Sequence, residues 1–339
     1  EVFARSKLPS ENRLDASRID RAYLGSLREK IAGCVVTAYK NIRPVRIGVG
    51  RGEIPEVVFN RRTIDPSGAC VMTFSVPPEV AATRRIQTDS EGNTTVAFTL
   101  PKEGSKLKFG PIDPGLCVLR VEDAAGDIAG SIVNFGCHPV CVYPYASTTI
   151  SADYPGDVTG LVEEAEGGIC LFTLAPAGNL VPYQRGLVAH RQMGRAIGGE
   201  ALKRLQFVRT TDDARLKALK RNIKFPAKKP ASADQAGDEA KTTDFITSEI
   251  QVIRIGDIYL LGLPGEVLVE IGLEIKRKAG VDNLFVISLS NDAIGYVCHD
   301  RAYEQGGYEP GSGTSLAKGA GPIMVREALD IIAQIKQGK

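Results

Sequence analysis

The sequence lacks a strong charge of either sign and lacks long hydrophobic runs. Its 42 Lys and Arg residues nearly balance 40 Asp and Glu residues, which leaves a formal net charge of +2. This balance gives no electrostatic case for a nucleic-acid partner or for binding to a strongly anionic surface. No apolar run approaches the roughly 18 residues of a membrane-spanning helix, so we predict no membrane span.

The sequence also lacks a cysteine pattern that would indicate a metal site. Its seven cysteines are an odd number and form no Cys-x-x-Cys motif. Cys137 and Cys141 flank His138, but in a continuous strand both thiols would point to the face opposite the imidazole. Four residues of strand would hold their Cα atoms roughly 13 Å apart, too far for a disulfide. We therefore predict that all seven cysteines are buried packing residues.

What is present is the composition of a globular protein. Hydrophobic residues make up 43% and charged residues 24% of the 339 residues, enough for a large core. Apolar or alternating runs predict strands at 45–49, 69–74, 95–100, 117–121, 128–135, 169–173, 249–254, 258–263 and 285–289. Helical spacing and helix-start signals predict helices at 19–42, from Pro155, at about 188–222, from Glu266 and at about 322–336.

Strands that alternate with helices predict an α/β fold. We expect a mixed β-sheet with flanking helices, because residues 60–135 read as consecutive antiparallel strands. The basic run at 217–224 is predicted to be a solvated helix face. Residues 225–242, which are poor in hydrophobic residues, are predicted to form an exposed insertion loop. We interpret residues 1–339 as one domain.

Histidine is scarce, with three in the whole chain, and His138 has the most informative surroundings. It ends an apolar, strand-like stretch, and a helix-start signal at 150–156 follows after a short loop. A strand that delivers an imidazole to its end and then turns into a helix is a common support for a metal or catalytic site. A hydrogen-bonded structural histidine is the alternative interpretation.

Several further motifs occur in a fixed order around this histidine. They are Asn60-Arg61, Gly110-Pro111-Ile112-Asp113-Pro114, Val118-Leu119-Arg120-Val121, Asn134-Phe135-Gly136-Cys137-His138-Pro139, Ser151-Ala152-Asp153-Tyr154-Pro155-Gly156, Ala177-Gly178-Asn179-Leu180-Val181-Pro182, Pro264-Gly265-Glu266, and the tyrosines Tyr296, Tyr303 and Tyr308. Together they resemble the neutral/alkaline non-lysosomal ceramidase family over about residues 19–308. The chain is similar to that family's catalytic domain, without its C-terminal immunoglobulin-like domain and without its N-terminal histidine-rich segment.

This resemblance implies a zinc site with His138, Glu266 and Tyr296 as ligands and with Tyr308 close to the metal. A nearby divalent cation can lower the pKa of a phenol far enough for it to coordinate. By position alone, Glu266 is a carboxylate stabilised by the start of a helix, and both interpretations can hold together. For the two tyrosines, the alternative is a packed ring whose hydroxyl bonds to the backbone.

The implied site is incomplete and changed in this chain. A catalytic zinc typically has three or more protein ligands and an open position, and the family's remaining histidine ligand belongs to its histidine-rich segment. His190 and His299 match no ligand position of the family, and we predict that both are surface or hydrogen-bonded histidines. Val181 stands where the family has its proposed serine nucleophile. Valine cannot attack a carbonyl, so metal-activated water remains as the nucleophile.

Three polar residues complete the candidate site. Arg61 matches an arginine near the family's substrate pocket and is predicted to hold a carboxylate or a polarised oxygen, with a surface salt bridge as the alternative. Asn179 is predicted to donate to an oxyanion, and an ordinary loop role is the alternative. Asp153 is either a helix cap or a partner that orients a metal ligand.

These features predict a zinc-dependent hydrolase that cleaves an amide bond in a ceramide-like N-acyl lipid or a related amide. Tyr308 would assist the carbonyl oxygen. The alternatives are a catalytically degenerate homologue that binds a lipid or glycan, and metal-dependent hydrolysis of an ester or carbohydrate. The predicted partner is a small-molecule or lipid amide substrate, and the oligomeric state stays open. The resemblance suggests a secreted or periplasmic location.

Overall fold

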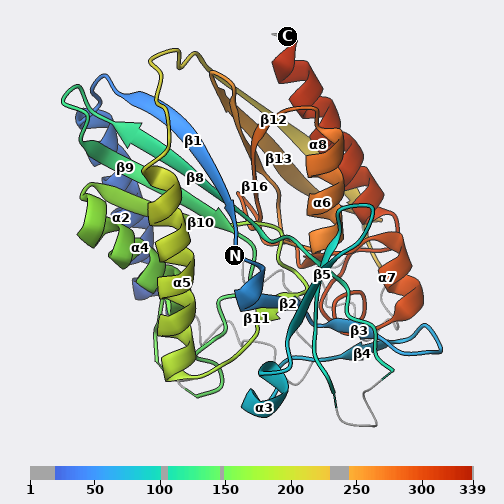
Figure 1. The fold of residues 1–339 in the computed structure, drawn as a ribbon. Coiled ribbons are helices and arrows are strands. Elements are labelled where there is room, and N and C mark those ends of the chain that lie inside the picture. The colour runs from blue at the N-terminus through green and yellow to red at the C-terminus, as the bar shows by residue number, and fades with distance from the viewer. Residues whose placement is uncertain (1–19, 101–105, 146–148, 230–243, 338–339) are drawn as a thin grey trace.

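The computed structural model describes residues 20–100, 106–145, 149–229 and 244–337. Two four-stranded sheets lie face to face in this part of the chain, and helices cover the outer face of each (Figure 1). The layers therefore follow the order helix, sheet, sheet, helix. The predicted α/β fold with a mixed sheet and flanking helices is confirmed, with two mixed sheets in place of one.

The first sheet has the strand order β1-β8-β9-β10, in which β10 is parallel to β9 and the other neighbours are antiparallel. Strand alternation gives it two apolar faces. Val118 and Val133 pack with the helices, whereas Leu119 and Ile132 face the second sheet. Its elements are β1 (Arg46–Glu53), β8 (Gly115–Glu122), β9 (Ile128–Phe135) and β10 (Ile169–Leu174), covered by α4 (Asp153–Glu166) and α5 (Leu187–Leu205).

The second sheet has the order β12-β13-β14-β16, in which β16 is parallel to β14. Ile258 and Phe285 face the first sheet, whereas Leu261 and Val286 pack against the outer helices. Its elements are β12 (Leu216–Pro226), β13 (Phe245–Ile255), β14 (Ile258–Gly262) and β16 (Asn283–Ile287), covered by α6 (Val269–Lys278) and α8 (Ala320–Lys336).

Short elements complete the fold, and two of them carry candidate site residues, since Glu266 begins β15 and Tyr296 begins β17. The pair β2–β11 is antiparallel and the pair β15–β17 is parallel. The short strands are β2 (Val58–Asn60), β3 (Arg62–Ile64), β4 (Cys70–Met72), β5 (Arg85–Thr88), β6 (Thr94–Ala97), β7 (Pro111–Ile112), β11 (Leu180–Pro182), β15 (Glu266–Val267) and β17 (Tyr296–Val297). The remaining helices are α2 (Arg21–Lys40), a 3-10 turn at Pro55–Val57, α3 (Pro78–Ala81) and α7 (Asp300–Gln305).

The predicted helix at 188–222 is wrong in its second half. α5 ends at Leu205, and β12 takes the place of the remaining helix. Ile223 and Phe225 are buried, while Lys224 between them is exposed. This period of two is typical of a strand with one buried face. The basic run at 217–224 therefore lies on a strand and not on a helix face.

The predicted loop at 225–242 is wrong at its beginning, because Phe225 and Pro226 end β12 and Phe225 is fully buried. Residues 230–242 of that prediction lie outside the described residues. The predicted helix at 19–42 is confirmed as α2. The Asp20 side chain caps it by accepting a hydrogen bond from the backbone N–H of Tyr23 at 2.8 Å.

Five of the seven cysteines are buried as predicted, but Cys34 is exposed on α2 and Cys70 is only partly buried. Cys137 and Cys141 are both buried and carry free thiols. β9 ends at Phe135, so strand alternation does not set the direction of either thiol. Within the described ranges, no helix combines the length and the hydropathy that crossing a bilayer requires.

Candidate functional site

Three side chains from distant parts of the sequence meet beyond the C-terminal end of β9. The Nε2 atom of His138 lies 3.3 Å from the hydroxyl oxygen of Tyr296 and 3.4 Å from Oε2 of Glu266. The backbone N–H of His138 donates to the carbonyl of Leu180 at 3.0 Å, which ties the histidine to β11. All three candidate metal ligands from the sequence are thus brought into contact.

β15 and β17 place Glu266 beside Tyr296, because these two residues are partners in the parallel pair. The prediction that Glu266 lies in the first turn of a helix is wrong, since α6 begins at Val269. Gly265 adopts a positive φ of 77°, a conformation that glycine reaches without steric cost. The backbone N–H of Glu266 then donates to the carbonyl of Gly295 at 2.9 Å. The turn therefore directs the chain into a strand pair before the helix starts.

Burial dominates the electrostatics of these three groups. Burial, aided by the positive charges of Arg61 and Arg185, lowers the pKa of His138 to about 3. Burial also raises the pKa of the Glu266 carboxyl and raises the pKa of the Tyr296 phenol well above its usual range. At neutral pH the imidazole is therefore uncharged, and the lone pair on its unprotonated nitrogen can bind a metal or accept a hydrogen bond.

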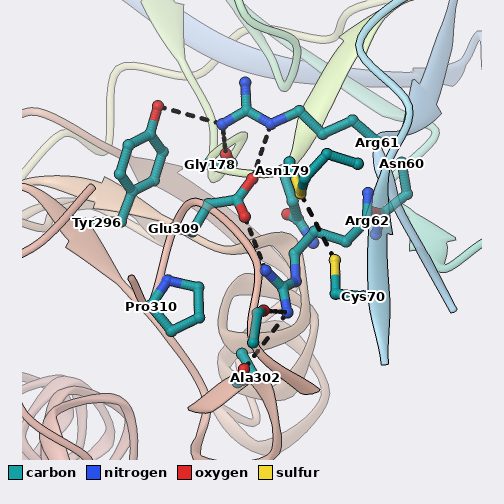
Figure 2. A network of polar contacts seen from close by, with 12 residues as sticks. Asn60, Arg61, Arg62, Cys70, Gly178, Asn179, Tyr296, Ala302, Glu309 and Pro310 are labelled. Carbon is teal, nitrogen blue, oxygen red and sulfur yellow. Dashed lines mark hydrogen bonds and ion pairs between the residues drawn. The ribbon is translucent and has the colours of Figure 1, made fainter. Parts of the chain in front are cut away.

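Arg61 connects this cluster to a buried carboxylate (Figure 2). Its Nη2 donates to the Tyr296 hydroxyl at 3.2 Å and to the carbonyl of Gly178 at 2.9 Å. Its Nε donates to Glu309 at 2.8 Å, and Nη1 of Arg62 donates to the second oxygen of Glu309 at 2.7 Å. Arg61 is therefore not in a surface salt bridge. It is a buried arginine that positions Tyr296.

Sequence reasoning missed Glu309, although it is fully buried and holds two arginines. No family motif marks it. A signal was present in Arg61 and Arg62, which follow the buried apolar residues of β2. Adjacent arginines within a buried segment require a carboxylate, since buried charges are almost always paired. The sequence could have predicted that such a partner exists, but not which acidic residue it is.

Tyr308 lies beside the cluster and reaches the surface. Its ring centroid is 5.5 Å from that of Tyr296 in an edge-to-face arrangement, and Cζ of Arg61 is 5.9 Å from its ring centroid. The side chain is 42% exposed, which makes it accessible to a small molecule. Its role toward a carbonyl oxygen remains a prediction.

Asn179 fixes the loop before β11 to the start of α6. Its side-chain oxygen accepts from the backbone N–H of Val269 at 2.9 Å, and its Nδ2 donates to both oxygens of Glu270 at 2.9 and 3.1 Å. These contacts satisfy an unpaired donor at the helix start. An additional role of Asn179 toward an oxyanion remains a prediction.

Val181 lies in the middle of β11, opposite Phe59 of β2, and is fully buried in the core that α4 and α5 share. At this position the chain therefore has a packing residue. Asp153 is the first residue of α4, and its Oδ1 accepts a hydrogen bond from the backbone N–H of Tyr154 at 2.8 Å. Its carboxylate accepts from the backbone N–H of Val142 at 2.9 Å, so it holds the loop that follows His138.

The other two histidines lie outside the cluster, as the sequence predicts. Nδ1 of His190 is 2.6 Å from the carboxylate of Asp157, which joins α5 to α4. Nδ1 of His299 accepts from the backbone N–H of Ala302 and caps α7, and its Nε2 is 3.8 Å from Glu270. Both are hydrogen-bonded structural residues.

His138 and Glu266 offer donor atoms of the kinds that zinc binds, and the two separations from His138 suit a shared zinc ion. Zinc binds nitrogen and oxygen at about 2.0–2.2 Å, which places neighbouring tetrahedral ligands about 3.4 Å apart. The separations of His138 Nε2 from Glu266 and Tyr296 are 3.4 and 3.3 Å. Among the described residues no cluster of three His, Cys, Asp or Glu side chains could hold a metal. The third donor of this site is a tyrosine.

Comparisons with known proteins support the fold. No protein-family model matches the sequence, and a search of curated proteins finds no match. The crystal structure of neutral ceramidase from Pseudomonas aeruginosa has a TM-score of 0.66 and 18% identity, covering 91% of this chain and 55% of that chain. A structure of ceramidase complexed with C2 has a TM-score of 0.63 and 17% identity, covering 88% and 55%. The resemblance inferred from the motifs is confirmed at the level of the fold, and the chain spans 55% of the length of each structure.

Proposed function

We propose that the chain provides the catalytic centre of a zinc-dependent hydrolase that cleaves an amide bond in an N-acyl compound. The observation that carries this proposal is the convergence of His138, Glu266 and Tyr296, with two oxygens within 3.4 Å of one imidazole nitrogen. The likeness of the fold to ceramidase structures supports an amide as the bond that is cleaved.

His138, Glu266 and Tyr296 would hold the zinc ion through one nitrogen and two oxygens. The lowered pKa of His138 supports this role, because a metal ligand must be unprotonated. When bound, zinc would supply the Lewis acidity that amide hydrolysis needs at neutral pH. Arg61 donates a hydrogen bond to the Tyr296 oxygen, so its positive charge favours the ionised phenol.

Water is the proposed nucleophile. Val181, at the position of the family's serine, offers no nucleophilic atom and is fully buried. The water oxygen adds to the carbonyl carbon, the C–N bond breaks, and a proton from the water ends on the amine nitrogen. Tyr308 lies beside Tyr296 and Arg61, and Nη1 of Arg61 carries no dashed contact in Figure 2. An O–H or N–H group at this place can orient the amide carbonyl.

The proposal is tested by zinc content and turnover measured on the same preparations. The full chain is purified, stripped with a chelator and reloaded with zinc. Metal is then counted by mass spectrometry, and release of the amine from N-lauroyl amides is followed. We expect bound zinc and zinc-dependent release in the unaltered chain and in His190→Gln, which lies outside the cluster. We expect both to be lost in His138→Ala, since it removes the nitrogen donor of the three described ligands.

Two results would contradict the proposal. Equal zinc content in His138→Ala and the unaltered chain would exclude this site as the metal centre. If the folded chain does not bind zinc and does not release amine, the result would favour a degenerate homologue that binds a lipid or glycan. Circular dichroism of each variant separates loss of the site from loss of the fold.

A further inference from the structure

Arg185 is a cation beside the candidate site whose hydrogen-bonding capacity is only partly used. It lies just before α5, and its Nη2 donates to the carbonyl of Phe74 at 2.9 Å while its Nη1 approaches the carbonyl of Tyr143 at 3.4 Å. Its Nε is buried and has no hydrogen-bond partner among the residues that the structure describes. A buried donor without a partner is rare in native proteins and requires an explanation, such as a ligand that it awaits.

The local charges are unbalanced toward the positive. Each oxygen of Glu309 already accepts from one arginine, Arg61 or Arg62, and Glu309 forms no ion pair with Arg185. Within the described residues, no carboxylate lies in ion-pair distance of Arg185, whose hydrogen bonds go to uncharged carbonyls. A half-buried guanidinium with no anion beside it is a ready receptor for a carboxylate or phosphate.

Phe74 connects Arg185 to the cluster. Its carbonyl accepts from Arg185, and its ring centroid lies 5.5 Å from Cζ of Arg61. The unpaired cation therefore belongs to the same site as the proposed chemistry.

The surface around this cation is aromatic. Phe74 and Tyr143, whose carbonyls face Arg185, are 45% and 57% exposed, and Tyr308, which is 42% exposed, lies beside Arg61. Exposed rings beside an unpaired arginine offer apolar contact to one part of a ligand and a positive charge to another. The ligand that fits this combination is amphiphilic and carries a negative charge.

We propose that Arg185, in the positive field of Arg61, is an anion-binding subsite of the candidate active site, and that the substrate is an N-acyl amide with an anionic group. This inference rests on the proposed amide hydrolysis and narrows its substrate class. The preferred substrate is an amide whose carboxylate or phosphate pairs with the Arg185 guanidinium, as in an N-acyl amino acid. A neutral N-acyl amide lacks that contact.

The test compares three N-lauroyl amides that share an acyl chain. N-lauroylglycine carries a carboxylate, N-lauroyl-phosphoethanolamine carries a phosphate, and N-lauroylethanolamine is neutral. The quantity measured is the ratio of kcat/KM for each anionic substrate to that for the neutral one. A lost charged hydrogen bond corresponds to about 10- to 100-fold. We therefore expect both ratios to exceed 10 for the unaltered chain. The larger ratio shows whether the subsite prefers a carboxylate or a phosphate.

Variants separate anion binding from a purely structural role of Arg185. Arg185→Gln should reduce the ratio about 10- to 100-fold. Arg185→Lys keeps the positive charge but cannot donate to the carbonyls of Phe74 and Tyr143 as the guanidinium does, so it should keep part of the ratio. Arg195→Gln removes an exposed arginine of α5 and should leave the ratio unchanged. A ratio near 1 in the unaltered chain would overturn the inference, as would equal effects of Arg185→Gln and Arg195→Gln.

A binding experiment keeps this inference distinct from the proposed function. If no amide is hydrolysed, the proposed function fails, and titration calorimetry with N-lauroylglycine and N-lauroylethanolamine decides the subsite. At least 10-fold tighter binding of the anionic amide, lost in Arg185→Gln and partly regained in Arg185→Lys, would support it. Equal affinities for the two amides would refute it.

Discussion

Replacement of Glu309 by glutamine tests whether the buried arginines depend on one carboxylate. Glu309 is fully buried, and the side chains of Arg61 and Arg62 are 6% and 3% exposed. The substitution keeps the shape of the side chain but leaves two guanidinium charges in the interior without an anion. Removal of one partner from a buried ion pair costs about 3–5 kcal/mol. The total stability of a folded protein is about 5–15 kcal/mol, so we expect a severe loss.

The free energy of unfolding is measured by urea denaturation followed by circular dichroism. Glu304→Gln provides the matched control, because Glu304 lies on the neighbouring α7 and pairs with Lys318 at the surface. Exposed ion pairs contribute little, so this variant should unfold at nearly the same urea concentration as the unaltered chain. Glutamine has one acceptor oxygen for the two arginines, so the anchor of Arg61 Nε should weaken, and with it the hydrogen bond to Tyr296 and turnover.

One result would refute this reasoning. If Glu309→Gln lowers the free energy of unfolding by less than about 1 kcal/mol, the two arginines do not need the carboxylate. Solvent would then have to reach them in solution, and Arg61 would be a mobile side chain and not a fixed support for Tyr296.

Two further substitutions test how the site is built. Gly178→Ala would place a Cβ 2.8 Å from the carbonyl oxygen of Glu266. We therefore expect this variant to lose about 1–3 kcal/mol of stability and to retain less zinc. The control is Gly160→Ala on α4, where nothing lies within 4 Å of the added Cβ, and this variant should be equally stable or more stable. Val181→Ser puts a hydroxyl into the core and should cost about 2–4 kcal/mol without producing an acyl-enzyme in mass spectra. Unchanged stability, or an acylated serine, would contradict the assignment of Val181 to packing; Val71→Ser at the partly exposed β4 is its control.

Local patterns in the sequence were sufficient to predict helices and strands whose apolar residues repeat regularly and whose ends are marked. The strand predicted at 128–135 matches β9 (Ile128–Phe135) because an apolar run stops at a glycine before His138. β12 was misread as helix because its exposed lysines have high helix propensity, whereas the period of two at Ile223 and Phe225 is short. Propensity is a weak prior that tertiary packing overrides. In β12 the pairing with β13 along its whole length decides the structure.

Site residues that belong to a sequence motif were predicted, whereas site residues that are placed only by packing were not. His138, Glu266 and Tyr296 were found through resemblance, and the structure brings them together. Glu309 and Arg185 belong to no motif, because their positions follow from charge balance among buried groups. Such balance depends on which segments pack together, and a single sequence does not contain that information in a local form.

The geometry of the site is set by backbone pairing and not by the side chains alone. Glu266 and Tyr296 are direct partners in the β15–β17 pair, so the register of two strands holds a carboxylate beside a phenol. His138 is held by the carbonyl of Leu180, and Arg61 by Gly178 and Glu309. Donors that are fixed in this way lose little conformational entropy when a ligand binds. Affinity for zinc should therefore depend as strongly on residues such as Gly178, which touch no metal, as on the donors themselves.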